Sequence, residues 1–186
     1  KASPAQRTEL MSLARRAILD SHLEETMLWV ELNQATPRDR KLLAERHLIS
    51  SQLAEGDAPR AVAVSGNESL SVMVNEEDHL RLQAMRSGFD PLGAWGAASA
   101  LDDELGKHVP YSWHSDFGFL TACPTNTGTG LRASVLIHLP GLVLTKEITK
   151  VLAGLHQMGL TYRGLYGEGS EVVGNYFQIS NQTTLG

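Results

Sequence analysis

TACPTNTGTGLRAS, residues 121–134, is a polar loop that holds the only cysteine of the chain and leads directly into the apolar run 135–139 (VLIHL). Residues such as Thr, Asn and Gly favour turns and leave backbone N–H groups that can bind an anion. Arg132 stands where an extended segment leaves the loop, and an arginine fork at such an edge binds phosphate through two hydrogen bonds. The stretch therefore predicts a phosphate-binding loop followed by a strand.

An ordinary structural role for the same loop stays open at this point. Asn126, Gly128 and Gly130 are also typical of a hairpin, and a lone cysteine is more often a small buried apolar side chain than a nucleophile. The rest of the sequence has to decide between the two interpretations.

The composition is that of a chain with a substantial core. It has 186 residues, of which 42% are hydrophobic, and we expect one domain. Every apolar run is too short to span a membrane, and the first residues (KASPA) lack the apolar core of a signal peptide. A single cysteine forms no internal disulfide. We therefore expect a cytoplasmic protein without a membrane partner.

The charge distribution argues against nucleic acid as a partner. The net charge is −5, and both signs are spread along the chain without a basic patch. A zinc site is also not expected, because the spacing of His108, His114 and Cys123 matches no common zinc pattern.

Hydrophobic periodicity and turn residues predict the local structure. Residues 61–64 and 70–74 are short β-like runs separated by SGNES, which predicts a hairpin. Proline follows a capping residue at Thr36-Pro37 and Asp90-Pro91, which indicates two helix starts. We expect helices over residues 5–28, 37–56, 91–107 and 145–158, and strands over residues 61–64, 70–74, 79–84, 132–139, 160–166 and 176–179.

The strands come as hairpins and meanders more than as regular strand–helix alternation. This order predicts an α+β fold with a largely antiparallel β-sheet and helices against one face. No repeat and no break in composition marks a second domain, so residues 1–186 are expected to form one unit.

Three arginines are each predicted on a different strand, beside a turn rich in acidic residues or glycine: Arg81, Arg132 and Arg163. Two carboxylates, Glu77 and Glu168, adjoin the first and the third. If the strand of Arg81 reaches back to Glu77, both side chains lie on one face. Guanidinium groups neutralise a polyphosphate, and carboxylates orient a cationic acceptor and take its proton, so the set suits phosphoryl transfer.

Four segments in this order resemble the catalytic domain of the guanidino (phosphagen) kinases, whose fold is similar to that of glutamine synthetase. They are residues 75–81 (NEEDHLR), 123–134 (CPTNTGTGLRAS), 163–168 (RGLYGE) and 178–182 (QISNQ). The forms RGLYGEG and ISNQTTLG look most like the bacterial branch, the protein-arginine kinases. A weaker resemblance begins near Glu45, in the segment ERHLIS that contains His47.

The resemblance implies a kinase that uses ATP and Mg²⁺ to phosphorylate the guanidinium group of arginine, in proteins for the bacterial branch. Glu77 and Glu168 would hold that guanidinium, with Cys123 beside it as a thiolate. The nucleotide site carried over from the family consists of His47, Arg81, Arg132, Ala133, Ser134, Val135, Leu136, Arg163, Gly164, Leu165, Tyr166 and Gly167.

The sequence departs from the family pattern at its beginning. The family has an upstream Ser-Arg-x-Arg segment that supplies two more phosphate-binding arginines, and nothing here matches it. We therefore expect a catalytic core truncated at both ends, with any dimer formed through a domain outside this sequence. Two alternatives stay open, a decayed regulatory module that binds nucleotide or phosphoarginine, and a small-molecule arginine kinase.

Overall fold

The structure, a computed structural model, describes residues 2–21, 26–164 and 173–184. The chain divides into two compact units, residues 1–124 and residues 125–186, and each is described by itself. Among the described residues, no helix combines the length and apolar character that crossing a bilayer requires.

The first unit is built on a four-stranded antiparallel sheet in the order β1-β2-β3-β4. A two-stranded hairpin, β5-β6, follows later in the chain. The elements are α1 (Pro4–Asp20), β1 (Met27–Glu31), α2 (Pro37–Glu45), α3 (Ser51–Ala54), β2 (Ala61–Ser65), β3 (Leu70–Val74), β4 (Leu80–Ala84), α4 (Pro91–Gly106), β5 (Trp113–His114) and β6 (Gly118–Phe119).

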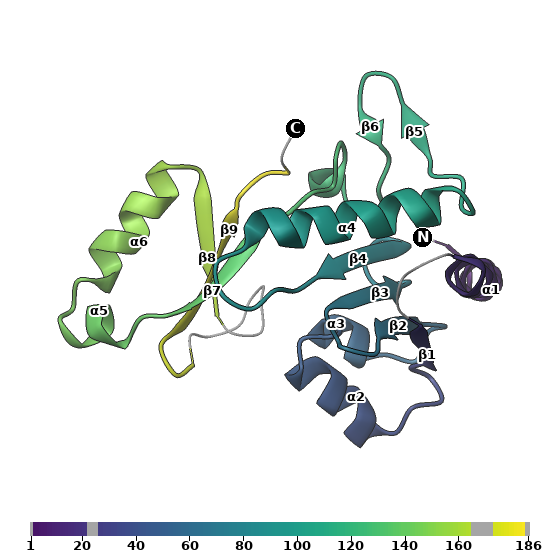
Figure 1. The fold of residues 1–186 in the computed structure, drawn as a ribbon, viewed down its shortest axis with the longest axis horizontal. Coiled ribbons are helices and arrows are strands. Elements are labelled where there is room, and N and C mark those ends of the chain that lie inside the picture. Colours follow the sequence, from purple (N-terminus) through teal and green to yellow (C-terminus); the bar gives the residue numbers. More distant parts are fainter. Residues whose placement is uncertain (1, 22–25, 165–172, 185–186) are drawn as a thin grey trace. The chain divides into compact units, whose positions relative to one another are not determined.

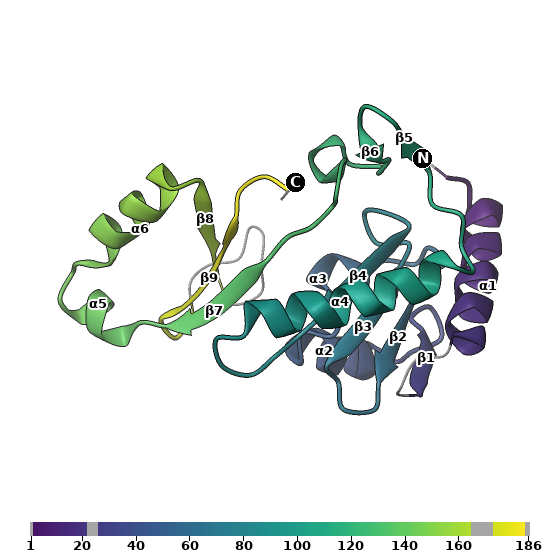
Figure 2. The ribbon, with the colours of Figure 1, turned by 45° about the horizontal axis from the view of Figure 1, so that its top comes forward.

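Helices cover both faces of this sheet, which corrects the expectation of helices on one face. Figures 1 and 2 show α1 and α4 on one side of the strands and α2 and α3 on the other. Ala61 and Ala63 of β2 pack with α1 and α4. Val62 and Val64 pack with α2 and α3. Since successive side chains of a strand point to opposite faces, β2 is buried along its whole length.

The second unit contains a three-stranded antiparallel sheet in the order β7-β9-β8. Its elements are β7 (Ser134–His138), α5 (Pro140–Leu144), α6 (Ile148–Gln157), β8 (Leu160–Arg163) and β9 (Tyr176–Asn181), and the short 3₁₀ helix η1 (Pro124–Asn126) stands at the boundary of the units in sequence. Helix α6 packs against β8. Leu152 of α6 and Phe177 of β9 are buried.

Several predictions from sequence are confirmed. The fold is α+β, and every strand pair in the described residues is antiparallel. The SGNES turn joins β2 and β3, which pair as a hairpin. Helix α4 starts as expected, with the Asp90 side chain accepting the N–H of Gly93 at 2.9 Å.

Three predictions of local structure are wrong. The first helix ends at Asp20, and Met27 and Leu28 belong to β1, because that segment pairs with β2. The helix predicted over 37–56 is two helices, separated by a turn in which His47 has a φ of 58°. Thr145 does not cap α6, because it ends α5 instead. The described strands also form three sheets where one was expected.

Candidate active site

The acidic segment that follows β3 is a fixed turn rather than an extension of β4. Asn75 is 2% exposed and has a φ of 60°, and its N–H donates to the carbonyl of His79 at 2.9 Å. The Asn75 amide nitrogen donates to the carbonyls of Arg7 and Pro59, each at 3.0 Å. Because β4 begins only at Leu80, the strand does not reach back to Glu77, which corrects that expectation.

Glu76, which sequence reasoning passed over, forms an ion pair with Arg81. The Glu76 side chain is 6% exposed and its Oε1 lies 3.4 Å from Arg81 Nη1. The same oxygen accepts the Ser50 hydroxyl at 2.6 Å, and Oε2 accepts the Glu77 N–H at 2.7 Å. A buried carboxylate with several donors is well compensated, so the Arg81 guanidinium has a fixed anchor while half of its side chain stays exposed.

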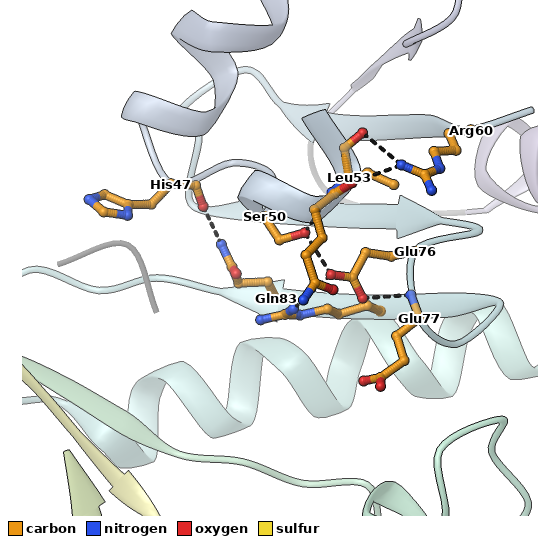
Figure 3. A network of polar contacts seen from close by, with 9 residues as sticks. His47, Ser50, Leu53, Arg60, Glu76, Glu77 and Gln83 are labelled. Carbon is orange, nitrogen blue, oxygen red and sulfur yellow. Dashed lines mark hydrogen bonds and ion pairs between the residues drawn. The ribbon is translucent and has the colours of Figure 1, made fainter. Parts of the chain in front are cut away.

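Glu77 is exposed, in contrast to its neighbour Glu76. In Figure 3 its carboxylate points away from the network around Glu76, and only its backbone N–H takes part in that network. The structure thus leaves the Glu77 carboxylate accessible to a ligand while its backbone is held.

His47 meets the same strand through its backbone. The side-chain amide of Gln83 donates to the His47 carbonyl at 2.7 Å, and Figure 3 shows the imidazole ring pointing away from Gln83. Gln83 lies two residues after Arg81 on β4, so both side chains emerge on the same face of the strand. The turn containing His47 is therefore tied to the strand that carries Arg81.

Cys123 has its backbone held at both ends. The Asp78 carboxylate oxygen Oδ1 accepts the N–H of Ala122 at 2.6 Å and the N–H of Cys123 at 3.2 Å. The Thr121 hydroxyl donates to the Cys123 carbonyl at 2.6 Å. The amides at this end of the loop are thus engaged by a carboxylate of the protein, and the anion-binding role expected for the loop does not fall on them.

Arg132 lies in the second unit, just before β7. Its side chain is exposed and has no hydrogen-bond or ion-pair partner within the part of the chain that the structure describes. The Asn181 side chain accepts the N–H of Ala133 at 2.8 Å and donates to the carbonyl of Leu131 at 3.2 Å. The backbone on both sides of Arg132 is therefore fixed, and the guanidinium is presented to solvent.

Strand register sorts the remaining nucleotide-site residues of this unit. Leu136 is paired with Gln178, and Gln178 with Arg163, so these side chains share one face of the sheet. Ser134 is on this face too, and its hydroxyl accepts the Gln178 amide at 2.9 Å. Val135 alternates to the opposite face, and both Ser134 and Leu136 are exposed.

The remaining residues named from sequence lie at and beyond the end of β8. Gly164 directly follows this strand and is buried, whereas Leu165, Tyr166, Gly167 and Glu168 lie outside the described residues. The first unit thus holds one group of predicted residues, which comprises His47, Glu77, Arg81 and Cys123. The second unit holds another, which runs from Arg132 to Leu136 and includes Arg163 and Gly164.

Sequence reasoning missed the residues that hold the predicted ones. These are Ser50, Glu76, Asp78, Gln83 and Asn181. Gln83 was detectable, because it shares the alternation of Arg81 along one strand. Glu76 lies only five residues before Arg81, but its contact depends on the turn between them. Ser50, Asp78 and Asn181 act through contacts across 26 to 50 residues of sequence, which no local pattern reveals.

A family model for the ATP:guanido phosphotransferase C-terminal catalytic domain matches residues 9–186. Among curated proteins, the chain is similar to the protein-arginine kinase of Shouchella clausii, at 53% identity over 148 residues, 80% of this chain and 41% of the relative. It is also similar to the protein-arginine kinase of Bacillus subtilis, at 51% over 157 residues, 84% of this chain and 43% of the relative. The chain thus spans less than half the length of these relatives.

Solved structures of similar fold are kinases as well. The duplicated taurocyamine kinase of Schistosoma mansoni, with bound components of a transition-state analogue, superposes with a TM-score of 0.83 at 26% identity, covering 99% of this chain and 27% of that one. Lombricine kinase gives a TM-score of 0.81 at 23% identity, covering 100% of this chain and 54% of that one, and is a likeness of fold.

Proposed function

This chain belongs to the ATP:guanido phosphotransferase family, and from that premise we propose that it transfers the γ-phosphoryl group of ATP to the guanidinium of arginine side chains in proteins. The choice of protein arginine over a free guanidino compound is supported by the curated relatives, which are identical to this chain at about half of the aligned positions and are named protein-arginine kinases. The structural neighbours named for small guanidino substrates are only 23–26% identical.

The observation that carries the proposal is the contact of Asp78 with the backbone of Ala122 and Cys123 in the first unit. Asp78 joins the turn that bears Glu77 to the segment that bears Cys123, so the exposed carboxylate and the thiol come from segments held together. An arginine guanidinium keeps its proton up to a pH above about 12 and is a poor nucleophile. In our proposal Glu77, with Glu168, aligns the guanidinium and accepts its proton as the phosphoryl group arrives.

The arginines are assigned to the phosphoryl donor, ATP, whereas the carboxylates are assigned to the acceptor. We propose that Arg81, Arg132 and Arg163 bind the phosphates of ATP, because planar guanidinium forks match phosphate oxygens. Arg81 is anchored by Glu76, and Arg132 has no partner in the part of the chain that the structure describes, so both present N–H donors to a ligand. In the second unit, the exposed residues Ser134 and Leu136 are also proposed to contact the nucleotide.

Magnesium fits this proposal as a partner of the nucleotide. Among the described residues, no group of three or more His, Cys, Asp or Glu side chains is arranged to hold a metal ion. Mg²⁺ in kinases is bound largely through substrate phosphates and water, with few protein ligands. We propose that it arrives on ATP and neutralises phosphate charge there.

The bacterial relatives also favour a cytoplasmic location.

The test is a phosphorylation assay on the full-length protein with ATP and Mg²⁺. The acceptors are free arginine and an unfolded, arginine-rich protein, and the acid-labile phosphate of each is measured. We expect label on the protein. Label on free arginine alone would overturn the protein-substrate part of the proposal.

A nucleotide-binding titration, run beside the assay, separates a kinase from a binding module. Turnover together with binding supports the kinase. Binding of ATP without turnover on either acceptor would contradict it and would favour the regulatory module.

A further inference from the structure

The loop 121–134 is gripped near each of its ends by a side chain from a distant part of the sequence. We propose that Asp78 and Asn181 are positioning residues, the first for Cys123 and the second for Arg132. The assignment of Cys123 to the acceptor and of Arg132 to the nucleotide rests on the function proposed above. The effect of each positioning residue on the loop can be measured without turnover.

Asp78 acts where the loop begins. Its carboxylate accepts the N–H groups of Ala122 and Cys123, and hydrogen bonds to an ionised acceptor are about twice as strong as neutral ones. The Thr121 hydroxyl holds the carbonyl of Cys123 on the other side. With its N–H and C=O both engaged, Cys123 has a defined backbone orientation, and its Cβ–Sγ bond projects in a defined direction.

The same carboxylate also sets a spacing. Asp78 follows Glu77 directly in sequence, so its contact with Cys123 fixes the distance between the acidic turn and the cysteine segment, 45 residues apart in the chain. Asn75 holds the other end of that turn. An acceptor guanidinium gripped by Glu77 and Cys123 would therefore meet two groups whose separation Asp78 maintains.

Asn181 acts where the loop ends. It is 9% exposed and closes β9, and it bonds to the peptide groups immediately before and after Arg132. Arg132 itself has an exposed side chain without a partner among the described residues, so nothing on the side chain fixes its direction. The backbone grip is what limits the region that the Arg132 guanidinium explores, and it lowers the entropy lost when a phosphate binds.

Asp78 is tested with two variants of the full-length protein. Asp78→Ala removes the acceptor, and Asp78→Asn keeps an Oδ1 that accepts both N–H groups without the charge. We expect Asp78→Ala to raise KM for the arginine acceptor by roughly ten- to a hundredfold and to change the rate and pH profile of Cys123 alkylation by iodoacetamide. The Kd for ATP should stay the same. In Asp78→Asn, both the KM and the alkylation of Cys123 should lie closer to the wild-type values than in Asp78→Ala.

Asn181 is tested with Asn181→Ala, or with Asn181→Ser if circular dichroism shows that the alanine variant does not fold. We expect the opposite pattern, with the Kd for ATP raised by roughly three- to thirtyfold and with Cys123 alkylation unchanged. Asp116→Asn in the β5-β6 turn and Gln157→Ala at the end of α6 are the controls, because both side chains are exposed and neither bonds to the loop.

The two patterns decide the outcome. Opposite selectivity supports both positioning roles, even if the protein proves inactive as a kinase, since alkylation and ATP binding need no turnover. If Asp78→Ala leaves Cys123 alkylation as in the wild type, the first role is overturned. Asn181 loses its role if the substituted protein binds ATP with wild-type affinity, or if alkylation and ATP binding change together with the melting temperature.

Discussion

The two sheets carry their predicted site residues in different ways. In the first unit, helices cover both faces of the sheet, and apart from Arg81 on β4 the predicted residues lie outside the strands, with the turn of Glu77 held by the buried side chains of Glu76 and Asn75. In the second unit, β7 exposes one face, and Ser134 and Leu136 reach it through strand alternation. Position is set by side-chain hydrogen bonds in one unit and largely by strand register in the other.

This difference separates stability from binding. A buried polar group that loses its partner costs stability, whereas an exposed residue on a strand can change without that cost. We therefore expect substitutions at the buried residues of the first unit to lower the free energy of unfolding. Substitutions at exposed site residues of either unit should change ligand binding or turnover and leave the free energy of unfolding as it is.

The largest effect is expected at Glu77, which is exposed although it lies in the tightly held turn. Glu77→Gln removes the charge that we propose to align the acceptor, so kcat should fall by roughly 10²–10⁴, the usual contribution of a positioned acid–base group. The Kd for ATP and the melting temperature should hardly change. Steady-state kinetics and calorimetry measure these quantities, with Glu9→Gln on α1 as the control. An unchanged kcat would remove Glu77 from the reaction.

Glu76→Gln should show the reverse balance. Both carboxylate oxygens of Glu76 accept hydrogen bonds, from Ser50, Arg81 and a backbone N–H. In glutamine an NH₂ group replaces one of these oxygens, so that NH₂ donor faces a hydrogen-bond donor of the protein. We expect the free energy of unfolding to fall by about 3 kcal/mol, since hydrogen bonds to a buried charge are lost. Urea denaturation measures it. Equal stability of Glu76→Gln and Glu9→Gln would contradict the distinction drawn between the buried and exposed acids.

Arg132→Lys examines the second unit. A lysine ammonium keeps the charge but not the planar fork, so ATP binding should weaken by about 2 kcal/mol, or roughly thirtyfold. Because the side chain is exposed and has no partner within residues 2–21, 26–164 and 173–184, the free energy of unfolding should stay the same. Isothermal titration with ATP provides the measurement, and Arg38→Lys on α2 is the control. A loss of stability instead would mean that the second unit also depends on its site residues.

The smallest effect is expected at Asp102 on α4, where burial is not fully compensated. Burial raises the pKa of the Asp102 carboxyl above its ordinary value, and the neighbouring charge of Asp103 adds to this. The folded state thus binds the proton more tightly than the unfolded state, so ionisation above a pH of about 4 opposes folding. Asp102→Asn should raise the melting temperature slightly at pH 7, and the gain should shrink toward pH 3.

Melting curves at the two pH values, with exposed Asp57→Asn as the control, test this sign. A lower melting temperature for Asp102→Asn at pH 7 would show that the charged form of Asp102 stabilises the fold.

The sequence predicted the parts of the fold that depend on local signals. The hairpin of β2 and β3 follows from its turn residues, and α4 follows from Asp90 and Pro91. Strand β1 was missed because the helical spacing of α1 continues into Met27 and Leu28. What makes that segment a strand is pairing with β2, more than 30 residues later, which periodicity does not report.

The candidate site was predictable in its residue types but not in its contacts. Alternation placed Glu77 on the face of Arg81 only if the chain stayed extended. The positive φ of Asn75 ends that extension, and Glu76 becomes the partner of Arg81. The roles of Ser50, Asp78 and Asn181 depend on tertiary contacts that a single sequence does not contain.

Asn75 implies an unusual limit on how this sequence can vary. Glycine would accept the φ of 60° but has no side-chain amide to donate to the carbonyls of Arg7 and Pro59. Aspartate would turn an acceptor toward those carbonyls, and glutamine would carry its amide one methylene too far. If every codon at this position were sampled under selection for a folded, active protein, we expect asparagine to be recovered almost alone, although Asn75 is not expected to touch either substrate.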